Sequence, residues 1–238
     1  MKTLLVASLI ASFAIASAVA ELPSVHSDFS DGTVDGWKFY AGGDPGSSVA
    51  PSSMGENTHH LKLTEGAIGG KDFFDAPAKF TGDKAIYYGG TLSFDIRVSD
   101  ASSPTTWRDD VVLIGANNTR LIHTFSSRPT VAWGSRTISL EIGDWYFDTA
   151  SHNPTASSDG WAWNLPATPP RLATEAEIRG VLADVKVLLI KADHRAGAET
   201  VYLDNVTMIA SVPEPGTSVL ILGGAALAAA FLRRRKQA

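Results

Sequence analysis

The sequence predicts an all-β domain folded as an antiparallel β-sandwich of jelly-roll type with one short helix. Three observations lead to this fold class. Many short segments alternate between apolar and polar residues, turns rich in glycine and proline separate them, and a single segment stands out with helical periodicity. The chain of 238 residues is long enough to bury a substantial core.

Two segments have the alternation expected of half-buried strands, Thr91–Val98 and Thr137–Ile142. In the second, Ile142 is expected to point inward with the other apolar residues. The runs Val111–Ile114 and Val185–Ile190 are apolar throughout, as in strands that are buried on both faces or covered by a helix. The remaining predicted strands are Gly36–Tyr40, His60–Thr64, Ile86–Tyr88, Leu121–Phe125 and the closing Val201–Ile209.

A helix is predicted just after Thr174. Thr174 and Glu177 have the Thr-x-x-Glu spacing of a capping box, in which each residue hydrogen-bonds the backbone N–H of the other. Ile178, Val181 and Leu182 then form an apolar stripe on one face. We therefore expect this helix to pack on the sandwich.

The C-terminal part, residues 212–238, has three features in sequence. A proline-rich stem is followed by the uncharged apolar run Thr217–Leu232 and then by a basic cluster. Sixteen helical residues span about 24 Å, slightly less than a hydrocarbon core of about 30 Å, so the run predicts a short transmembrane helix. The basic cluster is expected to stay cytoplasmic, which leaves the preceding domain on the far side of the membrane.

The N-terminal part predicts a signal peptide over residues 1–20. Lys2 supplies a positive charge, Leu4–Ile15 is an apolar core, and Ala18-Val19-Ala20 is a small-x-small cleavage site. We therefore expect an exported chain whose β-sandwich domain covers residues 21–211.

Amino-acid composition limits the ways in which the domain can be stabilised and the partners it can bind. The chain has no cysteine, so an exported domain must be stabilised by packing, hydrogen bonds or a bound ion. The formal net charge is −5, and removal of both targeting segments makes the domain more acidic. Nucleic acid is therefore excluded as an expected partner, because phosphate binding needs clustered lysine and arginine.

The C-terminal segment resembles the PEP-CTERM sorting signal of Gram-negative bacteria. The residues that match this signal are Pro213, Glu214, Pro215, Arg233, Arg234 and Arg235. The resemblance implies recognition by an exosortase-type membrane protease, anchoring in the inner membrane before processing, and delivery to the cell surface or exopolysaccharide. The alternative is an ordinary single-pass anchor with a proline-rich stem.

The domain itself is similar to the laminin B domain, also called laminin domain IV type A. The segments that carry the similarity are Asp28–Trp37, Phe73–Lys84, Tyr88–Asp95, Asp110–Gly115 and Tyr202–Val206. The resemblance implies a galactose-binding-like sandwich with a structural or adhesive role in an extracellular matrix, and no enzymatic role. Two departures are the absence of cysteine and a middle region, residues 126–170, that matches no family motif.

A structural calcium site is predicted where the first and last strands meet. Asp28 and Asp31 cluster near the start of the domain with Asp35, and Asp204 lies on the closing strand. Calcium is bound by six to eight oxygens, carboxylates among them. The alternative is that these aspartates hydrogen-bond within turns beside Gly32 and Gly36.

The tryptophans raise the question of glycan binding. Trp161 and Trp163 are two residues apart in the long loop His152–Leu172, so on an extended chain they share one face and can stack on sugar rings. The alternative is that they close the edge of the sandwich, since tryptophan is usually largely buried. Trp37 and Trp107, beside strands, are expected in the core or at its rim.

No enzyme is predicted. The chain has no Gly-x-Ser-x-Gly nucleophile motif and no cysteine nucleophile. Two hypotheses remain: a structural or adhesive module of the cell surface or exopolysaccharide, and a carbohydrate-binding module or glycan-active enzyme on the same sandwich.

Overall fold

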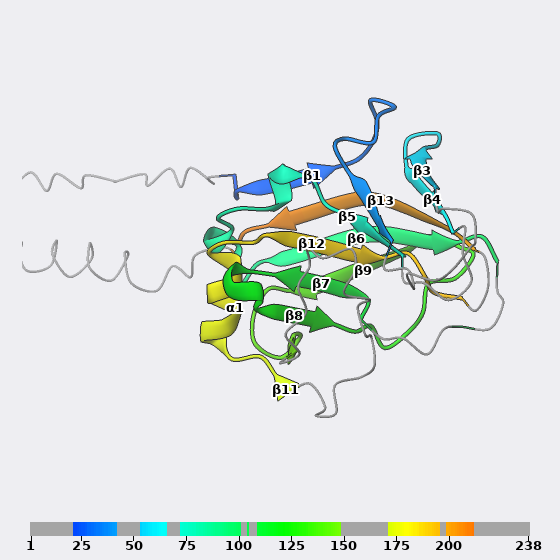
Figure 1. Cartoon of the computed structure of the whole chain (residues 1–238). Helices are drawn as coiled ribbons and strands as arrows, with labels where there is room; N and C mark the ends of the chain where they lie inside the picture. Colours follow the sequence, from blue (N-terminus) through cyan, green and yellow to red (C-terminus); the bar gives the residue numbers. More distant parts are fainter. Residues whose placement is uncertain are drawn as a thin grey trace, which may run out of the picture.

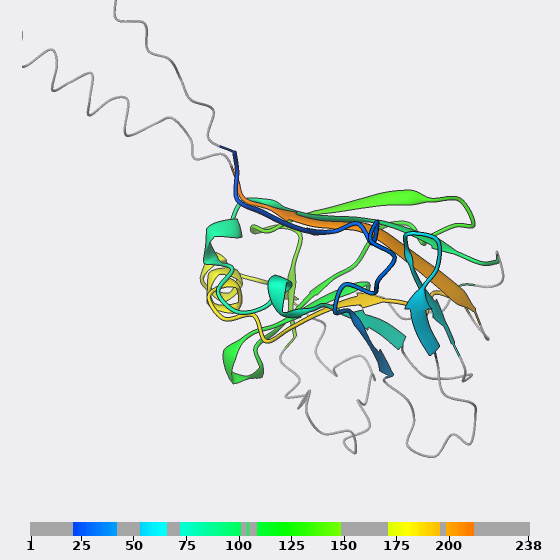
Figure 2. The same ribbon diagram turned by 90° about the horizontal axis from the view of Figure 1, so that it is seen from above.

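The computed structural model describes residues 21–41, 53–65, 72–100, 104, 109–148, 171–195 and 199–211. These residues form two sheets that face each other as a sandwich (Figures 1 and 2). In the six-stranded sheet the order is β3-β4-β13-β6-β9, with β1 also paired to β13. Its strands are β1 (Ser24–Ser27), β3 (Ser53–Glu56), β4 (Leu61–Thr64), β6 (Thr91–Val98), β9 (Gly134–Ser139) and β13 (Thr200–Ile209).

The seven-stranded sheet has the order β11-β10-β8-β7-β12-β5-β2. Its strands are β2 (Lys38–Ala41), β5 (Asp72–Asp75), β7 (Val111–Ile114), β8 (Arg120–His123), β10 (Tyr146–Asp148), β11 (Arg171–Leu172) and β12 (Val187–Lys191). Each strand pair described in the two sheets is antiparallel. The predicted all-β sandwich is confirmed.

The core lies between the sheets and follows from strand alternation. On β6, Leu92, Phe94, Ile96 and Val98 are buried, and the residues between them are partly exposed, as predicted. Burial of each such side chain contributes about 1.5–3 kcal/mol to folding. The largest buried side chains include Trp37, which was expected in the core or at its rim.

The continuously apolar strands are buried on both faces, which confirms one of the two predicted arrangements. On β7, Val111 and Leu113 join the core between the sheets, whereas Val112 and Ile114 belong to a second apolar cluster. Strand β12 divides its residues in the same way. The second cluster also contains Phe73 from β5 and Leu189 from β12.

The helix α1 (Glu175–Leu182) begins with the predicted capping box. The Thr174 hydroxyl accepts a hydrogen bond from the Glu177 N–H, and the Glu177 carboxylate accepts one from the Thr174 N–H. Ile178, Val181 and Leu182 are buried in the main core. Helix α1 therefore covers one end of the sandwich (Figure 1).

Two predicted strands are corrected. Residues 85–87 form the 3-10 helix η2 (Ala85–Tyr87), and Ile86 is 61% exposed. The described residues also contain the 3-10 helices η1 (Ala78–Phe80) and η3 (Ala116–Asn118). Strand β9 ends at Ser139, and Ile142 is 58% exposed where an inward position was expected. The chain turns there because Asp144 Oδ2 accepts the Ser139 N–H and Gly143 has a φ of +111°.

The two ends of the described domain leave the sandwich together. Strand β1 pairs with the last residues of β13, and the Ala210 N–H donates to the Pro23 carbonyl at 2.9 Å. Both lie at the end covered by α1 (Figure 1). Gly90 makes this arrangement compact, because a Cβ there would lie 2.0 Å from the Ile209 carbonyl oxygen.

Within the described residues, no helix has the length and apolar character needed to cross a membrane. The predicted signal peptide, residues 1–20, and the predicted transmembrane helix, residues 217–232, lie outside the described residues.

The helix cap predicts a pH effect on stability. The Arg171 guanidinium donates to both carboxylate oxygens of Glu177, and chiefly for this reason the pKa of Glu177 falls from 4.5 to about 2. A depressed pKa contributes stability above the unfolded value that is lost as the pH falls through the folded value. Glu177→Gln should therefore be less stable than wild type at pH 7, and urea unfolding should show the difference shrinking between pH 4.5 and about 2. A difference that stays constant over that range would contradict this role.

Candidate functional site

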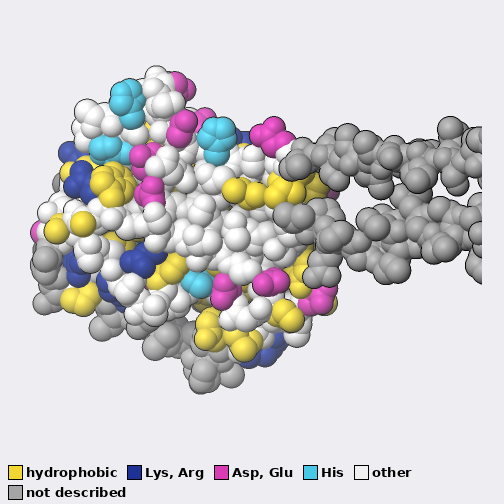
Figure 3. All heavy atoms as spheres, turned by 180° about the vertical axis from the view of Figure 1, so that it is seen from behind, with side chains coloured by type: hydrophobic (Ala, Val, Ile, Leu, Met, Phe, Trp, Pro, Cys, Tyr) yellow, Lys and Arg dark blue, Asp and Glu magenta, His cyan; other side chains and the backbone are white. Residues whose placement is uncertain are grey.

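The outer face of the six-stranded sheet is mostly polar. Serine, threonine and charged side chains of β6 and β9 point away from the core, and the centre of this face is largely white in Figure 3. These outward residues are Thr91, Ser93, Asp95, Arg97, Ser135, Thr137 and Ser139. Basic and histidine side chains lie with hydrophobic ones toward the end opposite the two long grey extensions, and other hydrophobic side chains lie beside those extensions (Figure 3).

Four residues at that end form what we call the distal patch: His60, Arg97, Trp133 and Tyr202. The Arg97 guanidinium carbon lies 3.8 Å from the centroid of the Tyr202 ring and 5.1 Å from that of Trp133. The His60 ring meets the Tyr202 and Trp133 rings edge-on at 5.3 and 5.5 Å between centroids. Cation–π and edge contacts of this kind hold aromatic rings in fixed orientations.

The register of β13 places the distal patch far from the two ends of the described domain. Tyr202 is the third residue of β13 and pairs with Arg97 on one side and Lys62 on the other. Ile209, beside the chain ends, lies seven residues further along, which is about 23 Å of extended strand. The patch and the exits of the chain therefore occupy opposite ends of the sheet.

The distal patch presents an aromatic surface with one permanent charge. Trp133 is 43% exposed. Burial lowers the pKa of His60 below its usual value, so this ring is neutral at pH 7 and Arg97 carries the positive charge. An exposed indole next to a guanidinium can stack on flat apolar groups and hydrogen-bond the oxygens around them.

A polar hollow adjoins the patch on the β3–β4 hairpin. It has a volume of about 310 Å³, and Lys62, which lines it, is the cross-strand neighbour of Tyr202. The other lining residues are Met54, Gly55, Glu56, Asn57 and Thr64. Patch and hollow together offer aromatic stacking beside amide, ammonium, carboxylate and hydroxyl groups.

The predicted calcium ligands are placed as follows. Asp28 accepts hydrogen bonds from the amide and hydroxyl of Ser30, and Asp31 accepts the same pair from Thr33. These are the turn contacts expected under the alternative interpretation. Asp35 is ion-paired with Lys79.

Asp204 lies directly across from Asp95 on the outer face of the sheet. Burial raises its pKa above the usual value, and the charges of Asp95 and Asp28 add to the shift. Asp95 accepts hydrogen bonds from Ser135 and Asn205. The calcium site formed by Asp28, Asp31 and Asp204 stays a prediction.

A second group of carboxylates, which we call the buried acid cluster, was not predicted from the sequence. Glu65 follows β4, and Asp193 and Glu199 lie on the connection from β12 to β13. One possible ligand atom from each residue lies within 4.8 Å of the others, and all three residues are buried. The Glu65 N–H donates to the Glu199 carbonyl at 2.9 Å, so the two glutamates are neighbours across paired strands.

Electrostatics in this cluster are unfavourable to negative charge. Burial, followed by the charges of Asp193, Asp72 and Glu199, raises the pKa of Glu65 to about 8. Burial also raises the pKa of Glu199 to about 7, although the amides of His194 and Arg195 oppose the shift. The sequence gives only a weak signal for this cluster, because the three acids come together through the strand register that brings the end of β4 beside the start of β13.

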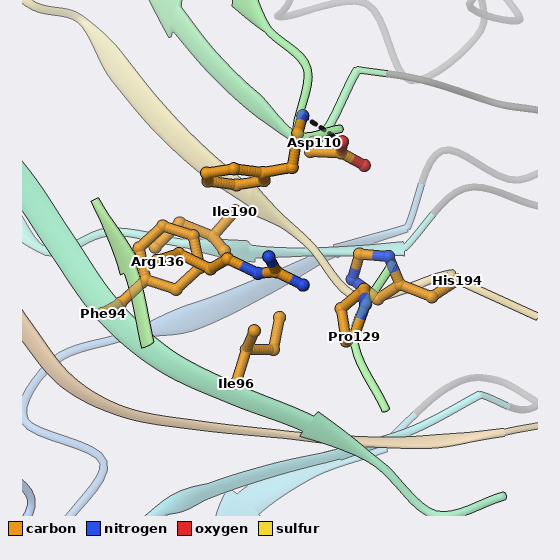
Figure 4. A pocket seen from close by; sticks show the side chains of 8 residues that line it. Phe94, Ile96, Asp110, Pro129, Arg136, Ile190 and His194 are labelled. Atoms are coloured by element: carbon orange, nitrogen blue, oxygen red, sulfur yellow. Dashed lines mark hydrogen bonds between the residues drawn. The ribbon is translucent and has the colours of Figure 1, made fainter. Parts of the chain in front are cut away.

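A small cavity lies between the sheets near Arg136 and His194 (Figure 4). The Arg136 guanidinium points toward His194, and the Phe125 N–H donates to Asp110. The cavity has a volume of about 10 Å³, which is room for about one water molecule. It is therefore too small for a substrate.

The tryptophans divide into two groups. Trp37 and Trp145 are buried, and the indole of Trp37 donates to Ser27 Oγ at 2.9 Å. Trp133 is the exposed one among those described. Trp161 and Trp163, predicted as glycan contacts, lie outside the described residues.

The chain is 32% identical over 184 residues to laminin subunit gamma-2 of Equus caballus. It is 29% identical over 170 residues to the basement membrane-specific heparan sulfate proteoglycan core protein of Mus musculus. These matches cover 77% and 71% of the chain but only 13% and 4% of the relatives. The chain therefore corresponds to a small part of each.

Solved structures with a similar arrangement include the L4b domain of human laminin alpha-2, with a TM-score of 0.45 at 16% identity over 59% of this chain and 70% of that one. The family 11 carbohydrate-binding module of Clostridium thermocellum Lic26A-Cel5E has a TM-score of 0.47 at 14% identity, covering 82% and 99%. The agarase AgWH50C has a TM-score of 0.49 at 14% identity, covering 80% and 25%.

Two family matches agree with the resemblances in the sequence. Residues 211–236 match the PEP-CTERM protein-sorting motif. Residues 73–220, more than half of the chain, match Laminin B (Domain IV). The protein is thus a member of the laminin B (domain IV) family that carries a C-terminal PEP-CTERM sorting motif.

Proposed function

We propose that this protein is an exported, non-enzymatic module that is displayed at the cell surface or in exopolysaccharide and acts in adhesion or matrix structure. The observation that carries the proposal is the presence in one chain of a laminin B domain and a PEP-CTERM motif. The first matches laminin subunits among the relatives, and the second is a protein-sorting motif.

The path of the chain supports display. Both ends of the domain leave the sandwich at one end, and the distal patch lies at the other. A domain attached through its C-terminal segment would therefore turn the distal patch away from the attachment. Such a geometry suits a module that contacts partners outside the membrane.

The proposal also includes the route by which the chain reaches the surface. Residues 1–20 act as a signal peptide, residues 217–232 span the inner membrane of a Gram-negative cell, and an exosortase-type protease removes the tail. The recognition residues are those of the sorting motif: Pro213, Glu214, Pro215, Arg233, Arg234 and Arg235.

The partner we favour is a matrix glycan or exopolysaccharide bound at the distal patch. Trp133 supplies an exposed aromatic face, Arg97 a fixed charge, and the adjoining hollow a set of hydrogen-bonding groups. Trp161 and Trp163 remain proposed as further contacts. A dedicated carbohydrate-binding module, or a glycan-active enzyme, is the alternative on the same sandwich.

The described outer face offers little support for the enzymatic alternative. A retaining glycosidase needs two carboxylates about 5 Å apart that are available to the substrate. Asp95 and Asp204 face each other across β6 and β13, but Asp95 is held by hydrogen bonds from Ser135 and Asn205. Such contacts are typical of a structural carboxylate.

The sorting part of the proposal is tested by intact mass spectrometry. Surface-released wild type should lack residues 1–20 and most of 212–238, whereas Glu214→Ala should keep its C-terminal tail and remain in the membrane fraction. Glu141→Gln, on the exposed surface of the sandwich, is the control and should be processed like wild type. Release of a wild-type chain that still carries the tail would contradict the proposal.

The glycan part is tested by binding to the exopolysaccharide of the producing cell. Trp133→Ala should weaken binding about tenfold or more, since exposed tryptophans at binding sites commonly contribute at least about 1.4 kcal/mol. Ile142→Ala removes an even more exposed apolar side chain, three residues beyond the opposite end of β9, and should leave binding unchanged. Equal affinity of Trp133→Ala and wild type would exclude the distal patch as the binding surface.

A further inference from the structure

The buried acid cluster, Glu65, Asp193 and Glu199, has the dimensions of a cation site. Its ligand atoms lie within 4.8 Å of one another, and the three residues are 6%, 3% and 3% exposed. Calcium binds oxygen at about 2.3–2.6 Å, so two ligands on opposite sides of the ion lie about 4.6–5.2 Å apart. One ion can therefore contact all three carboxylates without a large movement of the backbone.

Two oxygens of the cluster are buried without a hydrogen bond. Glu65 Oε2 and Glu199 Oε2 accept none from the part of the chain that the structure describes. In Glu199 the other oxygen, Oε1, accepts the N–H groups of His194 and Arg195. This contact fixes the carboxylate and leaves Oε2 for another partner. Buried carboxylate oxygens are rarely left in this state, because desolvation without a partner is costly.

Two nearby basic residues act on the other two acids of the cluster. Lys191 acts electrostatically on Asp193, and Arg195 acts on Glu199. The Arg195 guanidinium also donates to the Pro129 carbonyl at 2.6 Å. Burial, followed by the charges of the acids Asp193, Asp72 and Glu199, disfavours the charged form of Glu65 and raises its pKa. A cation between the carboxylates would remove this repulsion.

We propose that Glu65, Asp193 and Glu199 bind a calcium ion at the distal end of the sandwich. The donor set consists of carboxylate oxygens, which suit a hard cation. If some of the carboxylates bind through both oxygens, the number of ligands approaches the six to eight that calcium takes. This site is distinct from the predicted calcium site. In that site Asp28 and Asp31 lie in the loop between β1 and β2, and Asp204 lies on the outer face of β13.

The ion would join both sheets at the end opposite the two ends of the described domain. Glu65 and Glu199 adjoin β4 and β13 of the six-stranded sheet, whereas Asp193 follows β12 of the seven-stranded sheet. In a domain without cysteine, such a link does what a disulfide does in other exported domains. It also lies beside the first residues of β13, three positions before Tyr202 of the distal patch.

The test compares calcium with chelator on the full-length protein and on Glu65→Gln. Wild type should melt at a higher temperature in calcium chloride than in EGTA, and calorimetric titration should show calcium binding. Glu65→Gln should weaken calcium affinity at least about 100-fold, because loss of residues that merely support metal ligands already costs about 10–100-fold. In EGTA this variant should melt no lower than wild type, because Glu65 Oε2 has no hydrogen bond to lose among the described residues. The loss of calcium binding is then not a loss of folding.

Asp204→Asn is the control that separates the two sites. It should keep the calcium-induced rise in melting temperature if the ion binds at the buried acid cluster. The proposal is overturned if wild type melts at the same temperature in calcium and in EGTA. It is equally overturned if Glu65→Gln binds calcium like wild type, or if Asp204→Asn alone abolishes the response.

Discussion

The structure depends above all on the pairing of one strand, β13, with three others. Along one edge it pairs first with β4 and then with β1, and along the other with β6. This arrangement brings the start and the end of the domain together and places Tyr202 beside Arg97. It also sets Glu199 next to Glu65, where the strand begins. The chain exits, the distal patch and the buried acid cluster therefore all follow from the register of a single strand.

That register separates the functions of the two ends of the molecule. At one end, β1, the last residues of β13 and helix α1 gather beside the chain exits. At the other end lie an aromatic surface with a fixed guanidinium and a buried group of acids. A module that is attached at one end and makes contacts at the other is consistent with a laminin B domain bearing a sorting motif.

The parts of the fold that sequence patterns predicted are those governed by local periodicity. Strand β6 has the expected bounds because every second residue from Leu92 to Val98 is apolar. The capping box at Thr174 and Glu177 depends on a spacing of three residues and formed as predicted. Ile86 and Ile142 were misplaced because both are apolar and yet lie on the surface. Ile86 lies in the 3-10 helix η2, and Ile142 lies in the turn after β9.

The candidate sites were harder to predict, since they depend on contacts between distant segments. Glu65 and Glu199 belong to no motif and become neighbours only when β4 pairs with β13. Arg97, His60 and Trp133 likewise come from three separate parts of the chain. Aspartates near turns, by contrast, are conspicuous in sequence, but Asp28 and Asp31 also have the local hydrogen bonds that turns provide.

The central claim, surface display of the sandwich domain, is tested most directly by labelling living cells. The chain has no cysteine, so Thr137→Cys, on the exposed outer face of β9, gives a single thiol. A membrane-impermeant maleimide added to intact cells should label this variant as fully as it does after lysis. Labelling that requires lysis would show that the domain is not displayed at the surface, and would contradict the account.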